Sequence, residues 1–196
     1  WYLKYGEDRW RAAVEAHVLD GPFEAYNSEN LGRFKHTLGW MKEWACSRLF
    51  GLGTKIPWDQ QWVIESLSDS TIYMAYYTVA HVLHGAGNLD GSSTDLDGTK
   101  RRRIVPADQM TEAAWDYIFF DTAAAPSNEQ RSSESLEALS EMRREFQYWY
   151  PLDLRVSGKD LIGNHLTMCL YNHAAVWPER PALWPRSMYC NGFVLL

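Results

Sequence analysis

The chain has 196 residues, 14% of them aromatic, and a formal net charge of −6 at pH 7. This length is enough for one substantial core, while the acidic charge gives no basic surface of the kind that binds nucleic acid by itself. Cys46, Cys169 and Cys190 lack CxxC spacing, and no apolar run approaches the ~20 residues of a membrane span, so we expect a cytoplasmic protein with reduced thiols, no zinc knuckle and no membrane contact.

In the first part of the chain the pattern predicts a short strand at residues 1–5 and a helix at 8–19, which the Gly21-Pro22 pair ends. A longer helix is predicted from Glu29 to Leu49, because apolar residues recur there at helical spacing. Residues 62–64 predict a strand. A Ser/Asp cluster then precedes a helix over about 72–82, with Asp69 or Ser70 as its N-cap.

The glycine-rich stretch at residues 51–55 is not expected to bind phosphate. It lacks the GxxxxGK[ST] order of a phosphate-binding loop, and no apolar strand leads into it. His81 and His84 lie three positions apart on one predicted helix face but have no evident third metal ligand. We therefore predict no protein-bound metal.

The middle of the chain contains two polar stretches, 85–104 and 122–133, that we expect to be surface loops. Residues 101–103, all arginine, are either a solvated charge run or a contact for RNA phosphate. Helices are predicted after Pro106 and from Ser133 or Ser135 to the residue before Pro151. Strands at 152–156 and 188–190, joined by a helix over 160–177, predict a parallel βαβ unit.

The pattern around the stretch from Ser157 to Leu166 predicts a strand, then a turn at a glycine, then a helix. In an open α/β sheet, ligands bind at this junction, at the carboxyl end of a strand. Gly158 lets a ligand approach the backbone. Asp160 is either an ordinary N-cap or a carboxylate that accepts hydrogen bonds from ribose hydroxyls. His165 and His173 fall on the buried face of the predicted helix.

Two long runs resemble one known family, in the same order. They are YPLDLRVSGKDLIGNHLTMCLYNHAAVWP at residues 150–178 and WACSRLFGLGTKIPWDQQWVIESLSDSTIYMAYYTVAH at residues 44–81. Both resemble leucyl-tRNA synthetase of the archaeal and eukaryotic cytosolic type. The resemblance implies an α/β fold, the second half of a class I synthetase Rossmann-like parallel sheet with helical connective segments. It places residues 1–50 as a connection returning from the editing insertion and 51–196 as the carboxyl-side half of the catalytic domain.

The same resemblance implies which residues meet the substrates. The ATP or adenosine residues would be Gly158, Asp160, His165, Asn191, Gly192, Phe193 and Val194. The leucine pocket would be lined by Leu67, Ser68, Ser70, Tyr73, Leu161 and His165. Gly163 stands where the family pattern has proline, and Leu161 where bacterial members commonly have histidine. In the family Ser47 and Arg48 lie beside the active site, and they are either ligand contacts or structural.

By resemblance, the reaction is leucine plus ATP, with Mg2+ accompanying ATP, giving leucyl-adenylate and pyrophosphate, followed by transfer to tRNA(Leu). The HIGH and KMSKS signatures of the family do not occur in these residues. We therefore expect a piece of a longer chain, inactive alone and without a catalytic residue in the strict sense. The alternative is a non-catalytic ligand-binding or interaction module derived from such an enzyme.

Overall fold

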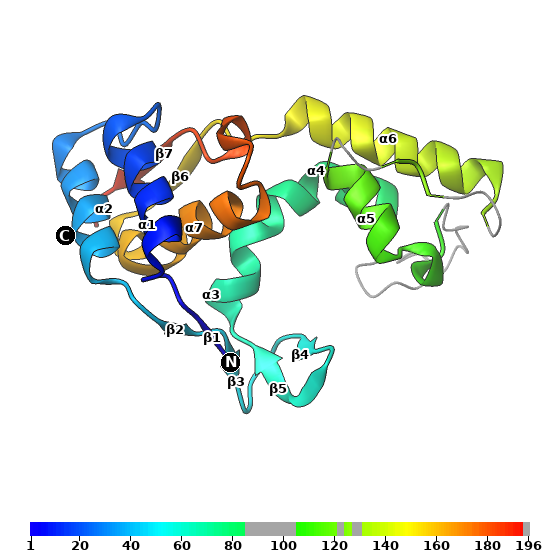
Figure 1. Ribbon diagram of the computed structural model, residues 1–196, viewed down its shortest axis with the longest axis horizontal. Coiled ribbons are helices and arrows are strands. Elements are labelled where there is room, and N and C mark those ends of the chain that lie inside the picture. Colours follow the sequence, from blue (N-terminus) through cyan, green and yellow to red (C-terminus); the bar gives the residue numbers. More distant parts are fainter. Residues whose placement is uncertain (85–104, 121–123, 127–130, 194–196) are drawn as a thin grey trace. The chain divides into compact units, whose positions relative to one another are not determined.

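The computed structural model describes residues 1–84, 105–120, 124–126 and 131–193. Most of the two predicted polar loops, including residues 101–103, and the predicted adenine contact Val194 lie outside this part. Contacts divide the chain into two compact units, Trp1–Tyr73 with Pro151–Leu196, and Met74–Tyr150 (Figure 1). The candidate site belongs to the first unit.

The first unit contains a parallel strand pair, which confirms that part of the prediction. Strands β6 (Arg155–Gly158) and β7 (Met188–Asn191) lie parallel, with Arg155 opposite Met188 and Gly158 opposite Asn191. A parallel bridge joins Glu24 to Ser187 on the other side of β7. The other sheets of this unit are small and antiparallel, so the described fold is mixed α/β with small sheets.

Strand β6 begins three positions later than predicted. The residues before it contact the segment that precedes β7 through separate interactions rather than a strand ladder. The Arg186 amide donates to the Leu152 carbonyl, the Ser187 hydroxyl donates to the Asp153 carbonyl, and the Arg186 and Asp153 side chains form an ion pair. The alternating apolar pattern that starts at Leu152 therefore predicted a strand that begins before the residues actually paired with β7. Leu154 is exposed rather than packed.

A long helical segment follows β6, as predicted, and a short 3-10 turn, η7 (Pro181–Leu183), precedes β7, but the start of the long segment is irregular. The long segment consists of η5 (Lys159–Leu161, 3-10), η6 (Ile162–Leu166, π-helical) and α7 (Thr167–Val176). The Thr167 hydroxyl donates to the Ile162 carbonyl at 2.6 Å, within this wider turn. π-helical turns occur frequently at functional sites.

Helices α1 (Asp8–Glu15), continued by the π-helical η1 (Ala16–Asp20), and α2 (Ser28–Trp40) pack against this segment (Figure 1). The Trp10 indole donates to the Tyr171 carbonyl at 2.6 Å, and the rings of Tyr5, Trp10 and Tyr171 lie 5.0–5.2 Å apart. Burial of this aromatic cluster ties α1 to α7, because large aromatic side chains dominate the energetics of a core.

The predicted helix over residues 29–49 is wrong in its second half. Helix α2 ends at Trp40, and Met41 is already extended. Strand β2 (Trp44–Ala45) pairs with β1 (Tyr2–Leu3), the predicted first strand, and β3 (Ser47–Arg48) pairs with β5 (Asp59–Ile64). The helical spacing of Met41, Ala45 and Leu49 was therefore coincidental, since strand pairing with distant residues overrides a local pattern.

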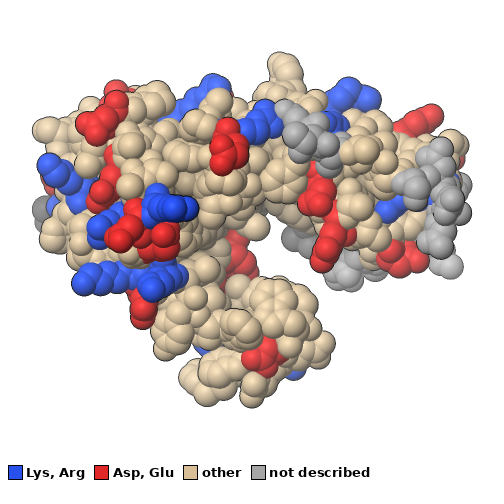
Figure 2. Space-filling view, in the orientation of Figure 1, with Lys and Arg blue, Asp and Glu red and all other residues tan. Residues whose placement is uncertain are grey.

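Strand β5 contains the predicted strand and also pairs with β4 (Lys55–Ile56). Beside it, four large apolar side chains are exposed: Leu49, Phe50, Leu52 and Trp58. In Figure 2 the small sheet formed by β3, β5 and β4, at the lower edge of the view, carries few charged side chains. The chain then forms α3 (Ser66–Asp69) and η2 (Ser70–Ile72). The N-cap prediction was wrong, because the helical conformation already begins at Ser66, where Glu65 accepts from the Leu67 amide at 2.8 Å. Asp69 is itself helical and, within the described part of the chain, makes no side-chain capping bond to η2.

The second unit is helical. Helix α4 (Tyr73–His84) leads into it, followed by η3 (Ala107–Gln109), α5 (Glu112–Phe119) and α6 (Ser133–Trp149). Ile118 of α5 and Leu139, Met142 and Phe146 of α6 are buried where these two helices pack. Helix α6 begins at Ser133, one of the two predicted starts, and the Ser132 hydroxyl caps it by accepting from the Ser135 amide at 3.2 Å. Within the described ranges, no helix combines the length and apolar character that crossing a membrane requires.

Candidate functional site

The carboxyl ends of the parallel strands β6 and β7 lie side by side, and the residues predicted to bind adenosine follow them in the chain. Gly158 closes β6 opposite Asn191 of β7. A Cβ atom on Gly158 would lie 2.5 Å from Asp160 Oδ1, so a side chain at this position would require the Asp160 carboxylate to move. Asp160 itself is exposed. Its oxygens therefore lie beside a bare stretch of backbone, where they are accessible to hydroxyl donors.

The N-cap interpretation of Asp160 finds no support in the geometry. The residue that precedes η5 is Gly158, and within the described part of the chain no side chain caps this helix or η6. A carboxylate at a helix start without a capping role is available for an external ligand.

The residues that follow β7 are exposed and lie next to the same strand end. Asn191, Gly192 and Phe193 are all accessible. The ammonium group of Lys159 lies 5.2 Å from the centre of the Phe193 ring, in a cation–π contact. This contact connects the end of β7 with the turn that carries Asp160.

Behind this edge, three side chains stack in order from Arg155 through Tyr73 to His165. The Tyr73 and His165 rings are stacked with centroids 6.1 Å apart, and the Arg155 guanidinium lies 5.3 Å above the Tyr73 ring. Arg155 Nη1 also donates to the Tyr73 hydroxyl. The structure thus joins two predicted leucine-pocket residues. It adds Arg155, for which the only sequence signal was its position in the strand leading to the glycine turn.

His165 is 4% exposed, and this burial lowers the pKa of its imidazole. The positive charge of Arg155 lowers the pKa further, whereas a hydrogen bond with the Ser70 backbone raises it. The ring is therefore neutral at pH 7. Its Nδ1 atom is buried and has no hydrogen-bond partner among the described residues. A neutral histidine with one uncommitted ring nitrogen can donate or accept one hydrogen bond to a ligand.

The segment that carries Leu67, Ser68 and Ser70 is fixed to α7 through Thr71. The Thr71 hydroxyl donates to the Ser68 carbonyl at 2.7 Å and accepts from Asn172 Nδ2 at 2.7 Å. The elements α3 and η2 contact η6, which brings this segment beside His165. No sequence pattern singles out Thr71, because its role depends on a partner 101 positions away.

His173, predicted as a buried histidine, completes this anchor. Its Nε2–H donates to the Thr71 carbonyl at 2.8 Å, and the side chain is 0% exposed. Burial lowers the pKa of His173 to about 4, with the Thr71 hydrogen bond opposing the shift, so the ring is neutral at pH 7. Leu67, Ser68 and Leu161 are half-buried, and Ser68 Oγ has no hydrogen-bond partner in the described part of the chain.

The remaining candidates have structural partners. Ser47 Oγ donates to the Trp1 carbonyl at 3.5 Å, and Arg48 Nη2 donates to the Leu52 carbonyl. His81 lies 4.0 Å from a Glu145 oxygen, and His84 contacts the Tyr76 hydroxyl. Across the described ranges, no group of three or more His, Cys, Asp or Glu side chains is placed to hold a metal ion.

Comparison with known proteins shows what this chain is similar to. No family model matches the chain. Over 196 residues, the whole of this chain, it is 48% identical to the cytoplasmic leucine–tRNA ligase of Pongo abelii and 47% identical to that of Arabidopsis thaliana. The chain matches part of a leucine–tRNA ligase. Leucine–tRNA ligase 2 of Metallosphaera sedula is 43% identical, also over the whole chain, so the match extends to archaea. The chain spans 16% of the length of the first two ligases and 18% of the third.

Proposed function

We propose that this chain is a part of a cytoplasmic leucine–tRNA ligase that forms one wall of the pocket for leucine and ATP. The observation that carries the proposal is the identity over the full chain with cytoplasmic leucine–tRNA ligases. Two parallel strands joined through a helical segment, with a third parallel bridge at Glu24, support a Rossmann-like parallel sheet continued by other parts of the enzyme.

The adenosine of ATP is held at the ends of β6 and β7. Asp160 accepts hydrogen bonds from the ribose hydroxyls, and the missing side chain of Gly158 allows the sugar to approach the backbone. Asn191, Gly192, Phe193 and Val194 frame the adenine. The exposure of Asp160 and of residues 191–193 beside the same strand ends supports these roles.

Leucine lies in a pocket walled by Leu67, Ser68, Ser70, Tyr73, Leu161 and His165. Support comes from the stack of Tyr73 on His165, the uncommitted Nδ1 of His165 and the anchoring of residues 67–70 to α7 through Thr71. Leu161 and His165 are four positions apart, so they share a face of the helical segment.

Within the reaction, these residues position the substrates. The leucine carboxylate attacks the α-phosphate of ATP, pyrophosphate leaves, and the resulting leucyl-adenylate transfers leucine to tRNA(Leu). Holding two reactants in the correct geometry can itself supply ~7–11 kcal/mol of the barrier. Mg2+ enters with ATP and offsets the charge of its phosphates.

The test is leucine-dependent exchange of pyrophosphate into ATP by the natural polypeptide that contains this sequence. We expect exchange in the wild type, and in Asp160→Ala a loss of ~1–3 kcal/mol in the use of ATP, the usual effect of leaving ligand hydroxyls without a charged acceptor. Asp153→Ala is the matched control, because this carboxylate is exposed and pairs with Arg186 at 2.6 Å. No exchange in the wild type would refute the enzyme function and favour a non-catalytic module. Unchanged ATP use in Asp160→Ala would refute the ribose role.

A further inference from the structure

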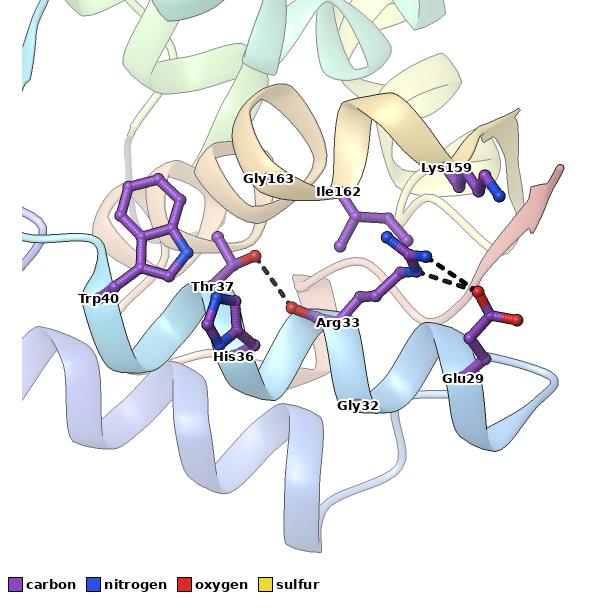
Figure 3. A pocket seen from close by; sticks show the side chains of 9 residues that line it. All are labelled: Glu29, Gly32, Arg33, His36, Thr37, Trp40, Lys159, Ile162 and Gly163. Atoms are coloured by element: carbon purple, nitrogen blue, oxygen red, sulfur yellow. Dashed lines mark hydrogen bonds and ion pairs between the residues drawn. The ribbon is translucent and has the colours of Figure 1, made fainter. Parts of the chain in front are cut away.

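A groove with a cavity volume of about 410 Å³ runs between α2 and the start of the helical segment after β6 (Figure 3). One wall comes from positions of α2 that recur at three and four residues, from Glu29 to Trp40, and the other from Lys159, Ile162 and Gly163. Thr37 and Ile162 are buried within it. This volume lies in the range of small-molecule sites, ~300–1,000 Å³.

The groove adjoins the proposed adenosine site at Lys159, which lines the groove and whose ammonium group also lies over the Phe193 ring. Lys159, Ile162 and Gly163 follow helical spacing and share the face that meets α2. Leu161 and His165 share a different face, on which His165 stacks with Tyr73. None of the residues proposed to bind leucine or ATP lines the groove.

One end of the groove is cationic, in a chain with a net charge of −6. Glu29 Oε1 accepts from Arg33 Nε at 3.2 Å and from Arg33 Nη2 at 3.0 Å, which holds the guanidinium in place. The pairing leaves Arg33 Nη1 without an acceptor among the described residues. Figure 3 shows Lys159 and Glu29 at the same end of the groove as Arg33. Arg33 and Lys159 are two cations against the single carboxylate of Glu29, so this end of the groove favours an anion. The N–H groups along one edge of an arginine guanidinium match the oxygens of a phosphate.

The other end is aromatic and open. Trp40 is 45% exposed and lines this end together with His36 (Figure 3). Two glycines deepen the groove, Gly32 on α2 and Gly163 on η6, since a Cβ atom at either position would have no neighbour within 4 Å. A glycine inside a helix costs ~1 kcal/mol of stability relative to alanine, so helix stability does not account for the glycine at position 32.

We propose that this groove is a second ligand site, for a nucleoside monophosphate, with the base against Trp40 and the phosphate at Arg33 and Lys159. The two ends suit such a ligand in chemistry and in spacing. Arg33 and Trp40 are seven positions apart in α2, about 10 Å along the helix axis. The site goes beyond leucine activation and requires no step of that reaction.

The test is a calorimetric titration of the natural polypeptide with AMP while a non-hydrolysable leucyl-adenylate analogue saturates the proposed active site. We expect AMP binding to persist. Gly32→Leu should abolish it, because a leucine side chain would occupy the groove from a position whose Cβ atom has no neighbour within 4 Å. Arg33→Gln should weaken it at least tenfold while leaving the fold intact, since an exposed pair with Glu29 contributes little stability.

Gly39→Leu is the matched control. Gly39 lies in the same helix with equally open space around its Cβ position, but it does not line the groove. We expect this variant to bind AMP as the wild type does. Equal loss in both glycine variants, or equal binding in both, would overturn the proposal.

Probes for each half of the ligand complete the test. Adenosine alone and inorganic phosphate alone should each bind at least tenfold more weakly than AMP, and either one binding as tightly as AMP would overturn the proposed two-ended site. If the analogue itself fails to bind, the proposed function fails. The groove is then still tested by AMP and the two glycine variants, because neither substitution touches the proposed active site.

Discussion

Replacing His173 by glutamine should remove a specific pH dependence from the stability of the fold. In the wild type the buried imidazole donates to the Thr71 carbonyl at 2.8 Å and has a pKa of about 4, whereas the unfolded chain has the ordinary histidine value of 6.5. Glutamine provides an amide N–H near the same position but does not titrate in this range.

The sign follows from proton binding. Between pH 6.5 and about pH 4 the unfolded state binds a proton at His173 that the folded state does not, so the free energy of unfolding falls as the pH falls. At ~1.36 kcal/mol per pH unit, the full effect is about 3 kcal/mol. About 2 kcal/mol of it is lost between pH 7 and pH 5. Above pH 7 the contribution is constant.

Urea denaturation of wild type and His173→Gln at pH 7 and pH 5 measures this effect. Other titrating groups, including the buried His17 and His165 whose pKa values burial also lowers, affect both proteins and cancel in the difference. We expect the wild-type stability, relative to the variant, to fall by about 2 kcal/mol from pH 7 to pH 5. A difference independent of pH would show that His173 is not held neutral by burial, and would refute the anchor inferred for Thr71.

Three further outcomes are expected. Leu67→Ala should reduce discrimination between leucine and smaller or branched amino acids by ~1–3 kcal/mol, measured as amino-acid-dependent pyrophosphate exchange; unchanged specificity would remove Leu67 from the pocket. Gly53→Ala should lower the urea midpoint, since Gly53 has φ +150° and a Cβ would lie 2.8 Å from Val63 Cγ1; a midpoint at or above that of the wild type would contradict this geometry. In the native protein a thiol reagent should modify the half-buried Cys46 but not Cys169, because burial raises the Cys169 thiol pKa to about 12, and rapid modification of Cys169 would disprove its burial.

Local patterns were sufficient for the elements whose burial follows their own periodicity. The helical segment after β6, the parallel partner strand, α1 and α6 all appear where apolar spacing, glycine and proline predicted them. The glycine turn at Gly158 and Asp160 was also evident from the sequence, because a strand, a glycine and a helix start are local features.

The sequence by itself indicated a resemblance to the leucine–tRNA ligases, since two long runs resemble them in the correct order, and the whole chain is 48% identical to part of one such ligase. It did not determine that α2 ends at Trp40, that Thr71 anchors the segment of Leu67, or that Arg155 stacks on Tyr73. Each of these depends on strand pairing, a hydrogen bond or a ring contact between residues far apart in the chain. Such contacts leave no periodic signal at either partner, so only the tertiary structure decided them.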